Sequence, residues 1–425
     1  MSTLLLRQGR LIDPSQQRDG VGDLLIRDGK ICEIAGEIGP VDEEIDCQGL
    51  IIAPGLIDLH VAVRDPGFEE DETTATATAA ALAGGFTAIA SLPDTNPPID
   101  NSAAAEYVVL QAARARHCKV YPLGAVTRDC AGQELADLGQ LSRAGAVGFS
   151  DAKSPIESAE IMRRALQYAR MFDRPIFSHP VEAKLSAEGV MHEGPVSTLL
   201  GLRGIPAAAE EIIASRDVAL AELTGGHVHL MSISTKHALD HIRRAKRNGL
   251  RVTCDVTPHH LSLTDACLEG YSSAYKVNPP LRSQEHVDAL IAGLKDDSID
   301  AISSDHRPWA AEKKDVELDR APSGIVGLET LLPICVGTLV DAGHLSWLQF
   351  LGKLTIGPAS ILGLPGGTLQ VGRPADVTMI DPALKWTIDP RQFASKSQNT
   401  PFAGREVRGR VRWTIVDGDI RYRLA

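Results

Sequence analysis

Eight short runs of buried-type residues, each followed by a helical segment, constrain the fold of this 425-residue chain more than any other feature. Strands that alternate with helices form a parallel sheet, and eight such units close into a barrel. The sequence therefore predicts an α/β fold built on a TIM-type (β/α)8 barrel, with its chemistry at the carboxyl ends of the strands. The predicted strands lie at residues 56–63, 86–93, 119–126, 146–151, 175–180, 227–234, 251–257 and 299–305.

Both ends of the chain have a different pattern, with short alternating segments typical of antiparallel strands. The segments "GDLLIRDGKICEIAG" (22–36) and "VRWTIVDGDIRY" (411–422) are each interrupted by an Asp-Gly pair, which favours a tight hairpin turn. Similar ends on either side of a different middle predict that residues 1–52 and 362–425 meet in a small β-sandwich domain. The barrel would then comprise residues 53–361.

Composition argues against several classes of function. Lys plus Arg number 43 against 55 Asp plus Glu, a net charge of -12, without a dense basic cluster, so we expect no nucleic-acid partner. No apolar run reaches the roughly 18 to 20 residues of a membrane span, so we expect no membrane association and a cytoplasmic location. The seven cysteines are scattered and never spaced CxxC, which indicates reduced thiols.

Polar residues follow nearly every predicted barrel strand. In "GLIDLHVAVRDPG" (55–67), His60, Ala62 and Arg64 alternate along a strand and point the same way. A metal site would need a second ligand at position 62, where the chain has alanine. The other polar residues at predicted strand ends include Asp94, Asp151, Lys153, His179, Ser232, Asp255, His259, His260, Asp305 and His306.

Taken in order, these motifs resemble the bacterial type I dihydroorotases of the amidohydrolase superfamily over essentially the whole chain. The resemblance rests on "PGLIDLHV", "LPDTNPPID", "FSDAKSP", "SHPVE", "GGHVH", "KVNPPLR", "SSDHRP" and "GIVGLET". It implies an enzyme that interconverts N-carbamoyl-L-aspartate and dihydroorotate in pyrimidine biosynthesis. In that chemistry a metal-bound hydroxide attacks an amide carbon, and the aspartate matched by Asp305 shuttles the proton.

The resemblance also assigns metal ligands, and half of the assigned positions lack a suitable side chain. A catalytic zinc normally has three protein ligands plus water, and neither half of the family's metal pair keeps that number. We therefore expect no bound cofactor or, at most, one zinc ion. The remnant ligands are His60, His179 and Asp305, and the ligands are lost at Ala62, Ala152 and Ser232.

The residues that would hold the substrate carboxylate are altered in the same way. The resemblance assigns this role to Arg64, which is kept, and to an asparagine and a histidine that have become Asp94 and Trp309. A carboxylate at position 94 repels an anionic substrate. Arg64 could equally be an ion-pair partner, for example of Asp94, while Asn278 is a kept remnant of the substrate site.

Neighbouring residues have structural interpretations as well. Lys153 follows Ala152 by one position, so strand alternation predicts that it turns away from the site toward the surface. We interpret His227 and His229 as structural and leave His259 and His260 open. The loop at residues 307–324 could fold over the cleft as a lid or pack against a neighbour.

The leading hypothesis is a pseudoenzyme, a non-catalytic dihydroorotase homologue that keeps the barrel and loses the metal centre. Its resemblance to inactive dihydroorotase-like chains implies a structural role in assembly with aspartate carbamoyltransferase. We also expect a homo-oligomer, in the simplest case a dimer. The rival is an active cyclic amidohydrolase with a single metal on His60, His179 and Asp305, in which Asp305 is the base.

Overall fold

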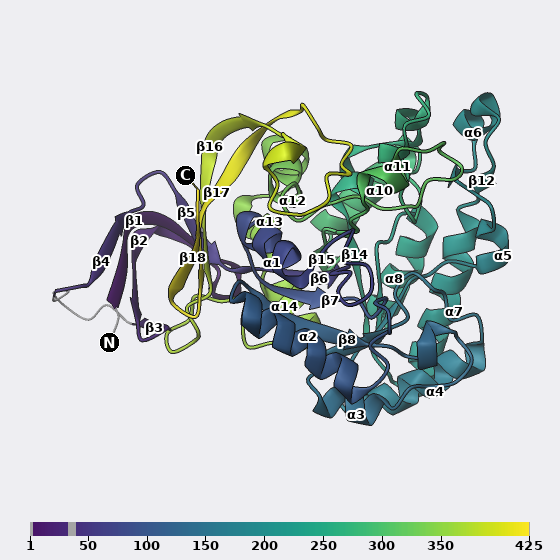
Figure 1. Ribbon diagram of the computed structural model, residues 1–425, viewed down its shortest axis with the longest axis horizontal. Coiled ribbons are helices and arrows are strands. Elements are labelled where there is room, and N and C mark those ends of the chain that lie inside the picture. Colours follow the sequence, from purple (N-terminus) through teal and green to yellow (C-terminus); the bar gives the residue numbers. More distant parts are fainter. Residues whose placement is uncertain (1–2, 33–39, 425) are drawn as a thin grey trace.

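The computed structural model describes residues 3–32 and 40–424, which form a barrel with a β-sheet on one side (Figure 1). Helices surround the barrel, and the sheet combines the purple N-terminal and the yellow C-terminal parts of the chain. None of the helices in these residues is both long and apolar enough to cross a membrane.

All eight predicted barrel strands are present, and each neighbouring pair is parallel. Their order in the sheet follows the chain, so each strand pairs with the next one in sequence. The predicted fold class is therefore confirmed. The strands are β6 (Leu56–Val61), β7 (Phe86–Ser91), β8 (Lys119–Gly124), β9 (Gly148–Ser150), β10 (Ile176–Ser178), β13 (Val228–Leu230), β14 (Val252–Val256) and β15 (Ala301–Ile302).

The first and last barrel strands meet through a buried carboxylate. Asp58 of β6 accepts a hydrogen bond from the Ser304 backbone N–H at 2.8 Å and another from the His60 N–H at 3.2 Å. The Ala62 N–H donates to the His306 carbonyl at 2.9 Å. These bonds bring the ends of β6 and β15 together, which places His60 beside the segment that carries Asp305.

Helices that follow the strands cover the outside of the barrel. Helix α1 begins after Thr73, whose hydroxyl accepts from the Thr76 N–H at 3.2 Å, and ends at Gly84. Capping of this kind satisfies a backbone donor that the first turn leaves free. The outer helices are α1 (Thr74–Ala83), α2 (Ser102–Ala115), α3 (Leu138–Arg143), α4 (Ala159–Arg170), α7 (Ala208–Thr224), α8 (Lys236–Arg247), α10 (Gln284–Lys295) and α14 (Ile356–Leu362).

Shorter elements lie between these units. Most of the connections that contain them begin at the carboxyl ends of the strands, as expected for the functional end of a barrel. They comprise α5 (Ala183–Ser186), β11 (Met191–His192), α6 (Pro195–Leu200), β12 (Gly204–Ile205), α9 (Pro258–Ser262), α11 (Ala311–Lys314), α12 (Leu331–Cys335) and α13 (Trp347–Gly352).

The two ends of the chain form one mixed sheet of eight strands, in the order β18-β17-β16-β5-β1-β2-β3 with β4 beside β1. The predicted hairpins are present at 28–29 and 417–418, where both residues of each pair have positive φ. Residues 33–36 of the first predicted segment lie outside the described residues, and the domain boundaries at 53 and 361 stay predictions. The strands are β1 (Thr3–Asp13), β2 (Arg18–Arg27), β3 (Lys30–Cys32), β4 (Glu43–Asp46), β5 (Ile51–Pro54), β16 (Val377–Thr387), β17 (Glu406–Val416) and β18 (Asp419–Arg423).

The connection between β16 and β17, residues 388–405, leaves the small sheet and reaches the mouth of the barrel. It is the yellow loop that extends across the green helices in Figure 1. The Asn399 side chain donates to the carbonyls of Arg307 and Gly324, each at 3.1 Å. This segment, hereafter the strap, ties the small sheet to the loops that carry the candidate site.

Candidate functional site

The mouth of the barrel holds a continuous cluster of buried charged and polar side chains. His60 lies at its centre, with its Nε2 atom 3.0 Å from Asp255 Oδ2 and its Nδ1 atom 3.4 Å from Asp305 Oδ1. Both carboxylates raise the pKa of His60 to about 10 against the opposing effect of burial. His60 is therefore an imidazolium whose two nitrogens face carboxylates, so neither offers a lone pair to a metal.

Lys153 lies inside this cluster, so the prediction that it turns toward the surface is wrong. Its ammonium is 2.9 Å from Asp305 Oδ1 and donates to the Asn278 carbonyl at 3.1 Å, with 11% of the side chain exposed. Strand alternation fails here because β9 ends at Ser150 and Ala152 takes a left-handed conformation with φ 51°. The turn at Ala152 directs the next side chain back into the mouth.

Lys153 also controls the charge of Asp305. Burial alone would raise the pKa of this carboxyl, but Lys153 and then His60 hold it well below its ordinary value. Asp305 is thus a carboxylate fixed between two cations. A carboxylate of such low proton affinity is a weak general base, because efficient bases have pKa values near the working pH.

The residues at the predicted metal positions do not fit a metal ion. Ala62 and Ala152 are 1% and 2% exposed and belong to one cluster of buried apolar side chains, together with Met231. Ser232 offers a single hydroxyl, which has no hydrogen-bond partner among the described residues. Within residues 3–32 and 40–424, no group of three or more His, Cys, Asp or Glu side chains is arranged to hold a metal ion.

His179 is buried at the mouth without a hydrogen-bond partner among the described residues. It follows β10 and is 3% exposed, and neither ring nitrogen has a hydrogen-bond partner in the part of the chain that the structure describes. Burial and then the charge of Lys153 lower the pKa of His179 well below its ordinary value, so the ring is neutral. A buried imidazole without hydrogen-bond partners destabilises the folded state, and no structural role for it is evident.

The predicted carboxylate-binding residues are paired with each other. Asp94 Oδ2 lies 2.7 Å from Arg307 Nη2 and 3.7 Å from Arg64 Nη1. The Arg64 guanidinium also stacks over Trp309, 4.3 Å from the ring centroid. The geometry thus matches the alternative in which Arg64 pairs with Asp94. The carboxylate of Asp94 lies beside the arginine that, by resemblance, would bind the carboxylate of the substrate.

The loop at residues 307–324 folds over the mouth. Trp309 covers Arg64, and its ring N–H donates to the Ser323 carbonyl at 2.9 Å. Lys313 lies 2.9 Å from Asp71 and 2.7 Å from Glu70, both in the loop that follows β6. Within the chain, the loop thus contacts the mouth of the barrel.

Histidines 227 and 229 have structural partners, in agreement with their interpretation from the sequence. Thr253 Oγ1 lies 2.9 Å from both rings, and His229 Nε2 contacts Asp255 at 2.8 Å. His260 contacts the Pro279 carbonyl at 3.0 Å. His259 differs, because neither of its ring nitrogens has a hydrogen-bond partner within the described chain.

The backbone at the mouth keeps a strained geometry. Arg64, Ala152, Ser232 and Asp305, which follow four different barrel strands, all have φ between 48° and 62°. A non-glycine residue in this region costs roughly 1 kcal/mol, and such strain concentrates at functional sites. At Ala152 and Ser232 the strained backbone persists although the side chain is not a usual metal ligand.

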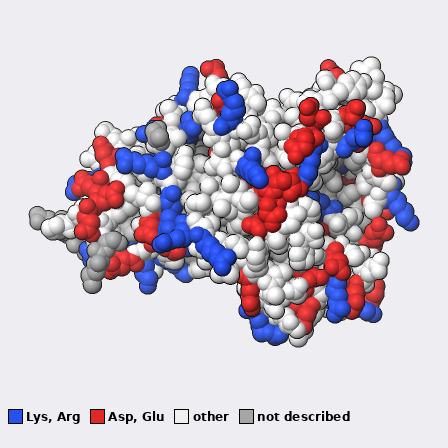
Figure 2. Space-filling model, viewed as in Figure 1, with Lys and Arg blue, Asp and Glu red and all other residues white. Residues whose placement is uncertain are grey.

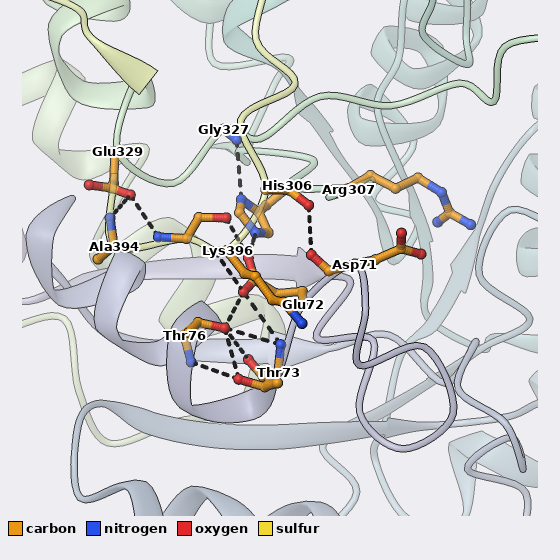
Figure 3. Close-up of polar contacts among 12 residues, drawn as sticks. Asp71, Glu72, Thr73, Thr76, His306, Arg307, Gly327, Glu329, Ala394 and Lys396 are labelled. Carbon is orange, nitrogen blue, oxygen red and sulfur yellow. Dashed lines mark hydrogen bonds and ion pairs between the residues drawn. The ribbon is translucent and has the colours of Figure 1, made fainter. Parts of the chain in front are cut away.

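A second polar cluster, not anticipated from the sequence, lies behind the mouth, and we call it the strap cluster (Figure 3). Its residues are Glu72, His306, Glu329, Ser395 and Lys396. Glu72 accepts hydrogen bonds from the Lys396 N–H at 3.0 Å and from the Ser395 hydroxyl, and its Oε2 is 3.5 Å from His306 Nε2. Glu329 accepts from the Ser395 N–H at 3.2 Å.

Figure 3 shows His306 turned toward Glu72, whereas Arg307 extends away from that cluster. Adjacent residues after β15 therefore serve different regions, since Arg307 pairs with Asp94 in the mouth. The strap cluster could not be anticipated from the sequence beyond the polar segment "DHRP", because its partners lie far apart in the chain, by 66 residues for Glu329 and Ser395 and by 324 for Glu72 and Lys396.

The parallel barrel, the polar residues at its strand ends and the sheet from both termini together define a protein of the amidohydrolase class. The profile of the Dihydro-orotase-like family matches residues 49–238. Dihydroorotase of Syntrophotalea carbinolica is 48% identical over 423 residues, covering 99% of both chains. The chain belongs to the dihydroorotase family.

Further comparisons agree with this assignment. Dihydroorotase of Anaeromyxobacter sp. (strain K) is 48% identical and covers 98% of this chain and 97% of its own length. Among solved structures, L-hydantoinase (dihydropyrimidinase) from Arthrobacter aurescens superposes with a TM-score of 0.88 at 25% identity, covering 100% of this chain and 98% of its own. Dihydropyrimidinase from Brevibacillus agri, at 23% identity and a TM-score of 0.84, covers 99% and 95% and shows the same fold.

Proposed function

We propose that this protein is a non-catalytic dihydroorotase homologue of pyrimidine biosynthesis with a structural role in assembly with aspartate carbamoyltransferase. The observation that carries the proposal is the ion pair between Lys153 and Asp305 at 2.9 Å. An ammonium at this place neutralises the carboxylate that the family uses as metal ligand and proton shuttle. Lys153 thus supplies the positive charge that a metal ion would otherwise provide beside Asp305.

The remaining groups lack the properties that hydrolysis needs. A water molecule must be activated by a metal or by a base of suitable pKa. The His60 imidazolium holds its proton because carboxylates raise its pKa to about 10 despite burial, and Asp305 has too little affinity for a proton. Asp94 also faces Arg64, which disfavours an anionic substrate.

The rival function is an active cyclic amidohydrolase with one metal ion. It is favoured by the 48% identity to proteins named dihydroorotase and by the presence of three remnant ligands, His60, His179 and Asp305. Metal analysis of the purified protein, together with an assay of dihydroorotate hydrolysis, distinguishes the two. We expect no stoichiometric zinc and no turnover at any zinc concentration; one zinc per chain with measurable turnover refutes the proposal.

Rebuilding the ligand set tests whether Lys153 itself prevents metal binding. The variant Ala62→His, Ala152→Asp and Ser232→His restores the missing donors, and we expect it to bind zinc only when Lys153→Gly is added. Lys153→Gly alone is the matched control, and it should bind none. Stoichiometric zinc in the triple variant that still contains Lys153 would show that the ammonium does not replace the metal.

The assembly role has its own test, which does not depend on metal. Analytical ultracentrifugation of aspartate carbamoyltransferase chains from the same organism, with and without this protein, reports the size of the assembly. We expect a larger complex that contains both chains. An unchanged carbamoyltransferase sedimentation profile, with this protein sedimenting separately, removes the structural role while leaving the loss of catalysis intact.

A further inference from the structure

A small cavity lies where the barrel, the strap and the small sheet meet. Its volume is about 30 Å³, which is room for one or two water-sized groups. Its walls come from the end of α1, the start of α12, the strap and strands β16, β17 and β18. The lining includes the polar side chains of Glu329, Arg410 and Tyr422 and the aromatic rings of Trp386 and Phe393.

Glu329 uses only one of its two carboxyl oxygens within the described chain. Its Oε1 atom accepts hydrogen bonds from the N–H groups of Ala394 and Ser395 at 2.9 and 3.2 Å. Figure 3 shows the second oxygen pointing away from these two N–H groups, and it has no hydrogen-bond partner among the described residues. Burial raises the pKa of this carboxyl to about 8, so near neutral pH it carries a proton that it can donate.

Arg410 and Tyr422 also lack polar partners in the part of the chain that the structure describes. The Arg410 guanidinium lies over the Trp386 ring, 4.4 Å from its centroid, and makes neither an ion pair nor a hydrogen bond there. The Tyr422 hydroxyl has no hydrogen bond within the same residues, and burial raises its pKa, so it keeps its proton. Three donors without an acceptor in the described chain therefore line one cavity, which is unusual for groups so placed.

The charges around the cavity favour an anion over a cation. A cation would lie beside the Arg410 guanidinium, whose charge has no ion-pair partner among the described residues. The carboxylate of Asp389, which also lines the cavity, is already bonded to Arg391 at 2.8 Å. An anion instead accepts from all three donors, and hydrogen bonds between charged groups are the stronger kind.

Outside this cavity, the surface offers little general attraction for anions. The chain carries a net charge of -12. On the face shown in Figure 2, Asp and Glu side chains are interspersed with Lys and Arg. An anion site on this chain therefore depends on groups gathered locally, as they are around Arg410.

We propose that this cavity binds a small carboxylate, of the size of formate or acetate, through Arg410, Tyr422 and Glu329. A guanidinium presents paired donors that match the two oxygens of a carboxylate, and the hydroxyl and the carboxyl add one donor each. The cavity excludes larger acids by its volume. Because Glu329 also accepts from the strap at Ala394 and Ser395, the bound anion ties the strap to β17 and β18.

Binding of ¹³C-labelled formate to the full chain, followed by the width of its NMR signal, tests the proposal. We expect a Kd in the millimolar range, because so few heavy atoms support no tighter binding. Arg410→Met should weaken binding about tenfold or more, and Tyr422→Phe about threefold. Arg412→Met is the matched control, since this arginine lies over Trp413 and does not line the cavity, and it should leave the affinity unchanged. Circular dichroism verifies that each variant is folded.

The pH dependence of formate binding tests the part played by Glu329. Above pH 8 the wild-type carboxyl ionises, loses its donor and repels the anion, so affinity should fall about tenfold between pH 7 and 9. The groups that face this carboxyl are Arg410, Tyr422 and Asp389 in the cavity and Glu72 beyond Ser395. Glu329→Gln keeps a donor without titrating, so its affinity should stay within about threefold of the wild type at pH 7 and change little with pH.

Three results overturn the proposal. One is the absence of formate binding at any concentration. Another is formate binding that Arg410→Met does not weaken, which would show a nonspecific contact elsewhere on the surface. The third is a preference for methylammonium over formate, which would show that the cavity takes cations. None of these results bears on catalysis, because the variants lie outside the mouth of the barrel.

Discussion

The mouth of the barrel and the strap cluster both bury charge, but they differ in how completely their polar atoms are used. In the strap cluster, Glu72 accepts backbone and hydroxyl hydrogen bonds while facing His306. In the mouth, both ring nitrogens of His179 and of His259 lack hydrogen-bond partners among the described residues. The strap cluster is hydrogen-bonded except at His306 Nε2, which lies 3.5 Å from Glu72, whereas in the mouth two histidines have neither ring nitrogen paired.

This difference indicates that the two clusters at this end of the barrel have different roles. Most buried polar groups in a folded protein are hydrogen-bonded, so buried groups without partners are unusual. The strap cluster holds the loops and the small sheet together, so it stabilises the fold. The mouth has unpaired groups and left-handed backbone at Ala152 and Ser232, features that stabilise nothing evident in the fold.

In the strap cluster, substitution of Glu72 should have the largest effect on stability. Glu72→Ala should lower the free energy of unfolding by about 3–5 kcal/mol, because it leaves the Lys396 N–H, the Ser395 hydroxyl and the facing nitrogen of His306 without an acceptor. Urea denaturation measures this loss. Glu70→Ala removes only an exposed ion pair with Lys313 and should cost far less stability, and equal losses in the two variants would contradict a structural role for the cluster.

Lys153→Met tests the charge pairing within the mouth. Without the ammonium, the Asp305 carboxylate faces only His60 and buried surroundings, so we expect a loss of about 2–3 kcal/mol at pH 7. A depressed carboxyl pKa contributes stability above its unfolded value, and that contribution is lost as the pH falls through the folded value. The difference between wild type and variant should therefore narrow under acid conditions.

The second substitution Asp305→Asn provides the control for this experiment. It removes the carboxylate that Lys153 balances, so the double variant Lys153→Met and Asp305→Asn should recover part of the lost stability. Strictly additive losses in the double variant would mean that the two residues stabilise the fold independently.

The fold was predictable because its signals are local. Runs of buried residues determine the eight strands, and Asp-Gly pairs determine the two hairpins. The bond that joins the first and last barrel strands was not predictable, because Ser304 and Asp58 lie 246 positions apart. The strap cluster was missed for the same reason.

The sequence predicted which residues lie at the mouth but not how they pair with one another. That Ala62 and Ala152 carry no donor atom can be read from the sequence alone. The position of Lys153 depends on one backbone angle, the positive φ of Ala152, which ends the two-residue alternation that the prediction assumed. Arg307 follows Asp305 by two positions, and nothing local shows that it contacts Asp94 across the mouth.

Glu329 of the strap cluster should make the free energy of unfolding depend on pH. Burial raises the pKa of this carboxyl to about 8, so the folded chain holds a proton that the unfolded chain releases near 4.5. The folded state binds more protons between these values, and stability falls as the pH rises through this window. Between pH 6 and 8 the wild type should lose about 2 kcal/mol more than Glu329→Gln, as measured by urea denaturation at each pH. Parallel pH profiles for the two proteins would contradict a protonated Glu329.

The smallest effect is expected at His179, in a matched pair with His306. His179→Leu removes two unpartnered nitrogens at nearly constant volume, so unfolding free energy should change by less than about 1 kcal/mol. His306→Leu leaves Glu72 without the ring nitrogen that faces it and the Gly327 N–H without an acceptor, so unfolding free energy should fall by about 3 kcal/mol. Equal losses of unfolding free energy in the two variants would mean that His179 has a partner in solution, such as a metal ion. The polar atoms of the mouth would then be bonded as fully as those of the strap cluster.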